Sequence, residues 1–210
     1  MADIPELENM EIDPHGMGHL ATFRQRMHIE FTADDTGYSG IYNYGGEVNT
    51  EQQAVHITLS VEGPAAMELP ANTLEAIWIS TRVWIKSGRQ PWIEVPESVS
   101  ELPFDEQTLA IGDFLPYVQH FDKVDDREMN GVPCAYYTYQ ADNVPTQYGT
   151  VNGSGDICVA LDGGYVVHYY LKGHGTFTSD EYFQGSGEIE LTYATYDVGA
   201  PIDIRSPRAR

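Results

Sequence analysis

The sequence predicts a mainly β protein, in which a strongly curved antiparallel sheet forms an unclosed half-barrel with a helix covering its mouth. Three observations lead there. The 14 tyrosines, 20 glycines and 12 prolines are typical of strands joined by many turns. Apolar and polar residues alternate along most of the chain, as in half-buried strands. About ten such strands follow one another, and a sheet of that width should curl rather than stay flat.

The first half of the chain contains six expected strands. They are residues 22–32, 41–48, 54–62, 74–79, 82–86 and 92–95. The first and third alternate most clearly, so their apolar side chains should face one side of the sheet. Those expected on the inner face are Phe23, Met27, Ile29, Phe31, Ile57 and Leu59.

All three tryptophans lie in the meander formed by residues 74–95, at positions 78, 84 and 92. Large aromatic side chains gathered in this way are normally part of a core. They also make flat walls for apolar ligands. Both interpretations stay open, and in the second Trp78 and Trp84 line a pocket.

One helix is expected, from Asp113 to about Phe121. Asp113 can cap its N-terminus, and Pro116 lies in the first turn, where a missing N–H costs little. A helical period places four apolar residues on one face, which are Phe114, Tyr117, Val118 and Phe121. The helix is therefore expected to cover the sheet, either as a fixed plug or as a lid over a ligand cavity.

The second half returns to strands at residues 123–129, 134–140, 157–161, 165–171 and 188–196. Asn130-Gly131 predicts a tight hairpin turn between the first two. Two polar stretches, 142–155 and 173–187, are expected to be long loops. We expect one domain over residues 19–204, between a flexible acidic tail at 1–18 and a disordered basic tail at 205–210.

The two cysteines, Cys134 and Cys158, lie in expected strands on either side of a polar stretch. Their spacing does not decide between a disulfide and two free thiols, since the cross-strand register is unknown at this point. There is no Cys-x-x-Cys pair, so no zinc or iron–sulfur site is expected.

Charge and motifs narrow the function further. A formal net charge of −21 argues against nucleic acid as a partner and against lying flat on an anionic membrane. The sequence has no nucleophile motif, no phosphate-binding loop and no metal-binding motif, so we expect no enzyme, no cofactor and no metal. No apolar run reaches transmembrane length, and no export signal precedes the polar N-terminal segment.

The order of these segments resembles the LolA/LppX-type lipoprotein-carrier superfamily of bacterial cell envelopes, over about residues 20–204. The segments that carry the resemblance are Ile77-Trp78-Ile79, Val83-Trp84-Ile85, Gln90-Pro91-Trp92-Ile93, Glu128 to Pro133, Ile157 to Val167 and Tyr196 to Ile204.

The resemblance implies an extracytoplasmic, non-catalytic domain that binds or carries a lipid or another apolar small molecule between sheet and helix. It implies a cavity lined by the inner residues and by the two tryptophans named above, and closed by the apolar face of the helix. Members are often tethered to a membrane through an N-terminal lipidated cysteine, which this chain lacks. The alternative is a structural, adhesive or sensory surface domain with a filled core and a protein partner.

Overall fold

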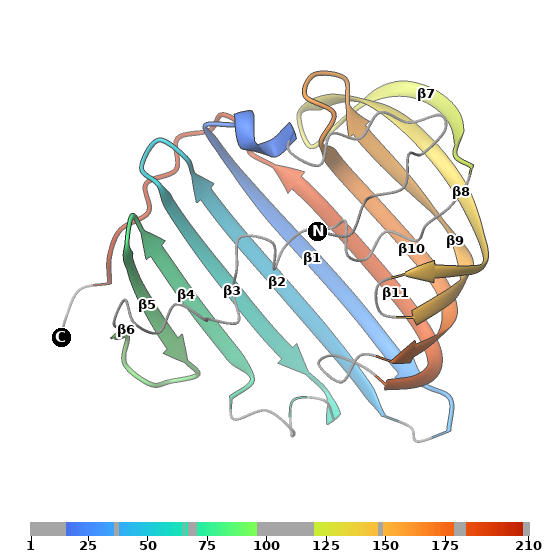
Figure 1. The fold of residues 1–210 in the computed structure, drawn as a ribbon, viewed down its shortest axis with the longest axis horizontal. Helices are drawn as coiled ribbons and strands as arrows, with labels where there is room; N and C mark the ends of the chain where they lie inside the picture. The colour runs from blue at the N-terminus through green and yellow to red at the C-terminus, as the bar shows by residue number, and fades with distance from the viewer. Residues whose placement is uncertain are drawn as a thin grey trace.

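The fold is an antiparallel sheet whose first and last strands pair at its centre (Figure 1). The computed structural model describes residues 16–35, 38–64, 66, 71–95, 120–146, 149–178 and 184–207. Within these residues eleven strands form one sheet in the order β6-β5-β4-β3-β2-β1-β11-β10-β9-β8-β7. Strands β6 and β7 are consecutive in the chain yet lie at opposite edges, so the sheet is not closed.

The strand bounds confirm most of the pattern predicted from alternation. The elements are η1 (Gly16–His19), β1 (Thr22–Ala33), β2 (Ser39–Asn49), β3 (Ala54–Glu62), β4 (Thr73–Ile79), β5 (Arg82–Ser87), β6 (Ile93–Val95), β7 (Asp122–Met129), β8 (Val132–Thr146), β9 (Gly149–Ala160), β10 (Val166–Thr178) and β11 (Gln184–Tyr196). The Asn130-Gly131 turn is confirmed, because both residues adopt the positive φ that a type I′ hairpin requires.

The two expected polar loops are wrong. Strands β8 and β9 include residues 142–146 and 149–155, and β10 and β11 include residues 173–178 and 184–187. Their inward positions often carry glycine and their outward positions carry polar side chains, which resembles a loop composition. The cross-strand pairs formed by the backbone are not visible in composition.

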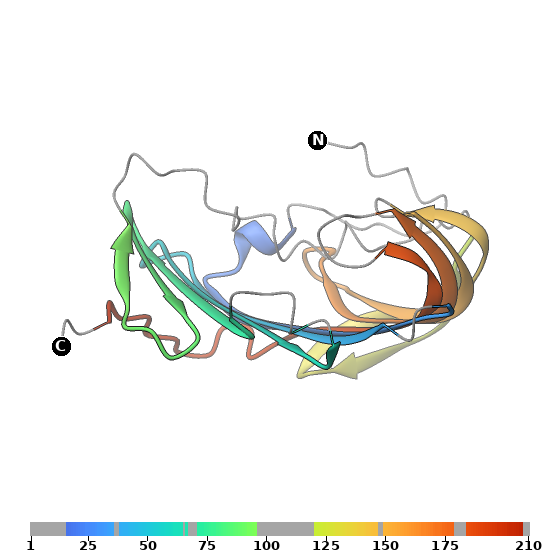
Figure 2. The ribbon, with the colours of Figure 1, turned by 90° about the horizontal axis from the view of Figure 1, so that it is seen from below.

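These glycines account for the strong curvature of the sheet. Gly153 of β9 pairs directly with Gly173 of β10. A Cβ built on Gly153 would lie 2.4 Å from the carbonyl oxygen of Lys172, and one on Gly173 would lie 2.3 Å from that of Asn152. Only residues without a Cβ allow so close an approach of two backbones. Figure 2 shows the result, a bowl whose β8–β11 side curls over the interior.

The outer face of the bowl is partly covered by the C-terminal segment, residues 197–207, which runs beneath β2–β5 in Figure 2. Asn49 donates a hydrogen bond of 2.7 Å to the carbonyl oxygen of Ile202, which holds this segment in place. A small apolar cluster results, made of Ala54, Ile77, Trp84, Ile202 and Ile204. The first residues of the expected basic tail, 205–207, are described, and 208–210 lie outside the described residues.

The short η1 helix packs against the sheet, although residues up to 18 were expected to be tail. The sulfur of Met17 lies 3.2 Å from the side-chain nitrogen of Gln25 and 3.9 Å from the hydroxyl of Tyr193. The ordered domain therefore begins earlier than predicted. No helix in the described residues is both long and apolar enough to cross a membrane.

Candidate functional site

The candidate site is the inner face of the bowl, which is almost entirely apolar. Alternation along each strand sends every second side chain inward, and antiparallel pairing aligns these positions across neighbouring strands. Met27 of β1 is thus opposite both Tyr44 of β2 and Tyr193 of β11. One continuous apolar cluster extends from β4 to β8 across the centre of the sheet.

On the β8–β11 side this cluster is packed solid. Tyr169, Leu191 and Ile157 have no exposed surface. Their burial follows from the curl of the sheet, which closes that side of the bowl over its own residues (Figure 2). This part of the inner face is a core rather than a binding surface.

Tyrosine hydroxyls inside this core are hydrogen-bonded to one another. The Tyr139 hydroxyl lies 2.6 Å from the Tyr169 hydroxyl and 3.1 Å from the carbonyl oxygen of Tyr170. The two rings stack with centroids 6.0 Å apart. Burial raises the pKa of both Tyr139 and Tyr169 well above the ordinary value, so both hydroxyls stay protonated.

Tyr193 forms a second buried group nearby. Its hydroxyl accepts a hydrogen bond of 2.6 Å from Gln25 and lies 3.1 Å from the hydroxyl of Thr195. Burial raises the pKa of Tyr193 to about 12, against the lowering effect of these two partners. The hydroxyls of Tyr139, Tyr169 and Tyr193 thus all have hydrogen-bond partners inside the packed half.

On the β3–β5 side the inner face is different. Its apolar side chains pack against the core cluster but are only half-buried, and they are Val55, Leu59, Leu74, Trp78 and Ile85. The register explains their common direction, since Val55 pairs with Trp78 and Leu59 pairs with Leu74. The inner face therefore offers one packed half and one half with accessible apolar surface.

The predicted cavity residues fall into these two halves. Met27, Ile29, Phe31 and Ile57 are buried in the core cluster. Phe23 is buried near the start of β1. The accessible half contains Leu59 and Trp78. Their contact with a ligand stays a prediction.

The expectation that Trp84 shares a pocket wall with Trp78 is wrong. Trp84 pairs with Ile77, whose side chain points outward, whereas Trp78 pairs with Val83 and points inward. Trp84 is 6% exposed and lies in the outer cluster under Ile202 and Ile204. Residues six positions apart share a face only when they belong to one uninterrupted strand. A turn separates residues 78 and 84, so the two-residue period does not continue from one to the other.

The predicted helix face lies mainly outside the described residues, and this includes Phe114, Tyr117 and Val118. Phe121 is described and is 5% exposed. Its ring packs against Tyr139 with centroids 5.3 Å apart, so it closes against the packed half of the bowl.

Several inner residues of the site were not predicted from the sequence. Tyr42 and Tyr44 are buried in the core cluster, and Leu74 and Ile85 face the accessible half. Alternation in β2 could have found the tyrosines. The last two needed the register of β4 and β5, which the sequence does not state.

The two cysteines form a disulfide. The Cα atoms of Cys134 and Cys158 are 5.5 Å apart, on the neighbouring strands β8 and β9. Both side chains are fully buried in a second apolar cluster near Tyr165 and Val167. A buried disulfide is typical of proteins that fold in an oxidising compartment.

The outer face carries the charges of the sheet as cross-strand pairs. Arg24 lies 2.7 Å from both Glu47 and Asp197. The hydrogen bond from Arg24 holds the pKa of the Glu47 carboxyl below its ordinary value, with His56 adding to the effect and burial opposing it. The described residues contain no group of three or more side chains suited to hold a metal ion.

Comparisons with known proteins find likeness in structure alone. No family model matches the chain, and no curated protein matches its sequence. Similar solved structures include MucB in complex with MucA (TM-score 0.34, 11% identity, covering 90% of this chain). This chain spans only 55% of that one.

Two further structures are similar over most of both chains. One is a putative outer membrane lipoprotein-sorting protein domain from Vibrio parahaemolyticus (TM-score 0.29, 8% identity, 87% of each chain). The other is a DUF1329 family protein from Desulfovibrio piger (TM-score 0.29, 9% identity, 90% of each chain). Identities and scores this low do not say what the present chain binds.

Proposed function

We propose that this chain is a non-catalytic, extracytoplasmic domain that binds or carries a lipid or another apolar molecule. The ligand would lie on the β3–β5 half of the inner face. The observation that carries the proposal is the contrast between the two halves of this face. One half is packed solid, whereas in the other half Leu59, Trp78 and Ile85 are only half-buried.

Three features support this assignment. An apolar concave surface with aromatic walls and few polar groups suits an apolar ligand, which needs area more than hydrogen bonds. The buried disulfide fits a protein outside the cytoplasm. The hydroxyls of Tyr139, Tyr169 and Tyr193 in the packed half are engaged in structural hydrogen bonds, which fits a non-catalytic interior.

The packed half also gives weight to the alternative, a surface domain that binds a protein partner on its outer face. The two proposals differ in one quantity, which is affinity for an acyl chain. We therefore suggest titrating the protein with 11-(dansylamino)undecanoate, an acyl probe whose fluorescence rises in apolar surroundings and which accepts energy from nearby tryptophan.

Two matched variants make the titration specific. Trp78→Ala removes an inner aromatic ring, and Trp92→Ala removes one that packs on the outer cluster. Burying a large apolar side chain contributes about 1.5–3 kcal/mol, so Trp78→Ala should weaken probe binding by about tenfold or more. Trp92→Ala should leave the affinity unchanged. Absence of saturable binding to the unaltered protein, or equal losses in both variants, would overturn the proposal.

A further inference from the structure

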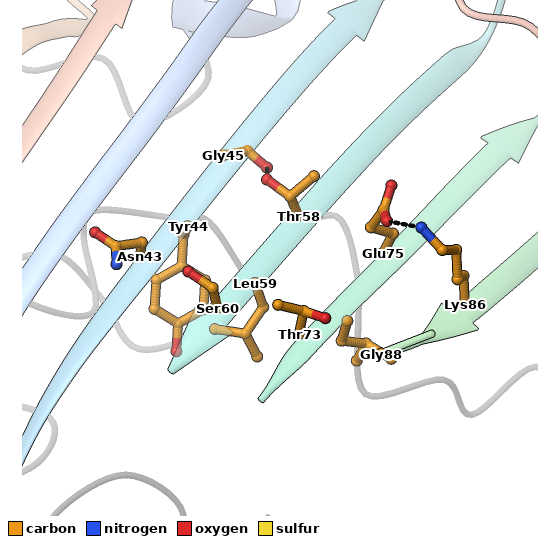
Figure 3. A pocket seen from close by; sticks show the side chains of 11 residues that line it. Asn43, Tyr44, Gly45, Thr58, Leu59, Ser60, Thr73, Glu75, Lys86 and Gly88 are labelled. Carbon is orange, nitrogen blue, oxygen red and sulfur yellow. Dashed lines mark hydrogen bonds and ion pairs between the residues drawn. The ribbon is translucent and has the colours of Figure 1, made fainter. Parts of the chain in front are cut away.

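A trough crosses strands β2–β5 on the outer face of the sheet, opposite the apolar face discussed above (Figure 3). Its volume is about 350 Å³. That lies at the lower end of the range of about 300–1,000 Å³ typical of sites for small molecules.

The register of the sheet creates the trough. Asn43, Ser60 and Thr73 lie directly opposite one another on β2, β3 and β4, so three short polar side chains form one row. The next row begins with Gly45, which pairs with Thr58. A Cβ at Gly45 would lie 2.7 Å from the Thr58 hydroxyl oxygen, so a larger residue there would fill the trough.

Longer side chains bound this low area. The second row ends with Glu75 and Lys86, which form an ion pair of 2.5 Å. Beyond it, Glu47 pairs with His56, whose ring nitrogen Nδ1 lies 3.3 Å from the Glu47 carboxylate. Glu47 is also bound to Arg24. The wall is therefore charged, but its charges already have partners.

The lining combines hydrogen-bonding groups with carbon surface, to which Tyr44, Leu59 and Leu74 also contribute, and it has no net charge. The hydroxyls of Ser60 and Thr73 make no side-chain hydrogen bond to another residue in the described part of the chain. The Oδ1 atom of Asn43 lies 2.7 Å from Nδ1 of His28, so the amide nitrogen of Asn43 remains as a donor group at the edge of the trough. Glu75 adds carboxylate acceptors and Lys86 adds ammonium donors.

We propose that this trough binds a neutral, hydroxyl-rich ligand, namely a saccharide unit. An anion would be repelled by the net charge of −21, and a cation would have to displace Lys86 from Glu75. Hydroxyl groups that both donate and accept match the mixed lining best. A peptide adding as a strand is excluded at this place, because β2–β4 are central strands whose backbone groups are already paired.

The trough and the proposed apolar site lie on opposite faces of the sheet but both involve Leu59 and Leu74, so each site is tested with its own variants. The test is a titration of ¹⁵N-labelled protein, followed by NMR, with the methyl glycosides of glucose, galactose and N-acetylglucosamine. At least one should cause saturable shifts in amides of β2–β5, with a dissociation constant of about millimolar size, as expected for an open polar site.

Variants make the assignment specific. Thr73→Val keeps the shape and removes one hydroxyl, and should weaken binding by about fivefold, as expected for one lost hydrogen bond. Ser60→Ala should act in the same direction. Thr32 is exposed on the outward side of β1 and lies outside the trough, so Thr32→Val should leave the affinity for the glycoside unchanged. Absence of saturable shifts with all three glycosides, shifts confined to other strands, or equal affinity in Thr73→Val and the unaltered protein would overturn the proposal.

Discussion

Reduction of the Cys134–Cys158 disulfide is expected to lower the free energy of unfolding by about 3.5 kcal/mol. The bond joins residues 24 positions apart. When the bond no longer closes a loop of that length, the unfolded chain gains about 11.6 cal/mol/K of conformational entropy. This favours the unfolded chain by about 3.5 kcal/mol at 25 °C. That is a large share of the roughly 5–15 kcal/mol by which domains are stable.

The assay is urea unfolding of oxidised protein and of protein that has been unfolded, reduced and refolded under reductant. With an ordinary urea dependence, the midpoint should fall by more than about 1 M. A variant with both cysteines replaced by alanine serves as the control and should not respond to reductant. A loss below about 1 kcal/mol in the reduced protein would refute the loop-closure reasoning.

Two other predictions concern single hydrogen-bonding groups. Burial lowers the pKa of His28, but the hydrogen bonds that its ring donates to Asn43 and Glu30 raise it overall. The stability that His28 contributes is therefore fully present below its unfolded pKa of about 6.5 and is lost as pH rises through its folded pKa. In thermal unfolding at pH 5.5, His28→Gln should therefore be less stable than the unaltered protein by less than about 1 kcal/mol, and this difference in stability should be smaller at pH 8. A difference that grows with pH would contradict the prediction. Tyr139→Phe should lower the free energy of unfolding, measured in urea, by about 1–3 kcal/mol, because it leaves the buried Tyr169 hydroxyl without its partner. Tyr169→Phe should lower it by only about 1 kcal/mol, because the Tyr139 hydroxyl keeps its hydrogen bond to the carbonyl oxygen of Tyr170. Equal losses in the two variants would count against the assigned hydrogen bonds.

Much of the fold could be predicted because alternation is a local property. The inward direction of Met27, Ile29 and Phe31 follows from a two-residue period alone, and the structure confirms it. The turn at Asn130 could likewise be predicted, since few residues tolerate its backbone conformation.

What failed depends on pairing between strands. The stretches around Gly153 and Gly173 have a loop composition, yet they pair with each other and bend the sheet. Trp84 and Trp78 are close in sequence, but their faces are set by the register of β4 and β5. The division of the inner face into a packed and an accessible half depends on this curvature, so composition could not predict it.

If the β3–β5 half of the inner face holds an apolar ligand, that ligand should remain bound when the protein is purified. The most direct measurement is native mass spectrometry of the protein as purified by gentle extraction, with no ligand added. We expect a bound species with the mass of a lipid or another apolar molecule. It should be lost on organic extraction and reduced in Trp78→Ala but not in Trp92→Ala. Repeated detection of the bare chain alone, at 23.4 kDa, would contradict it.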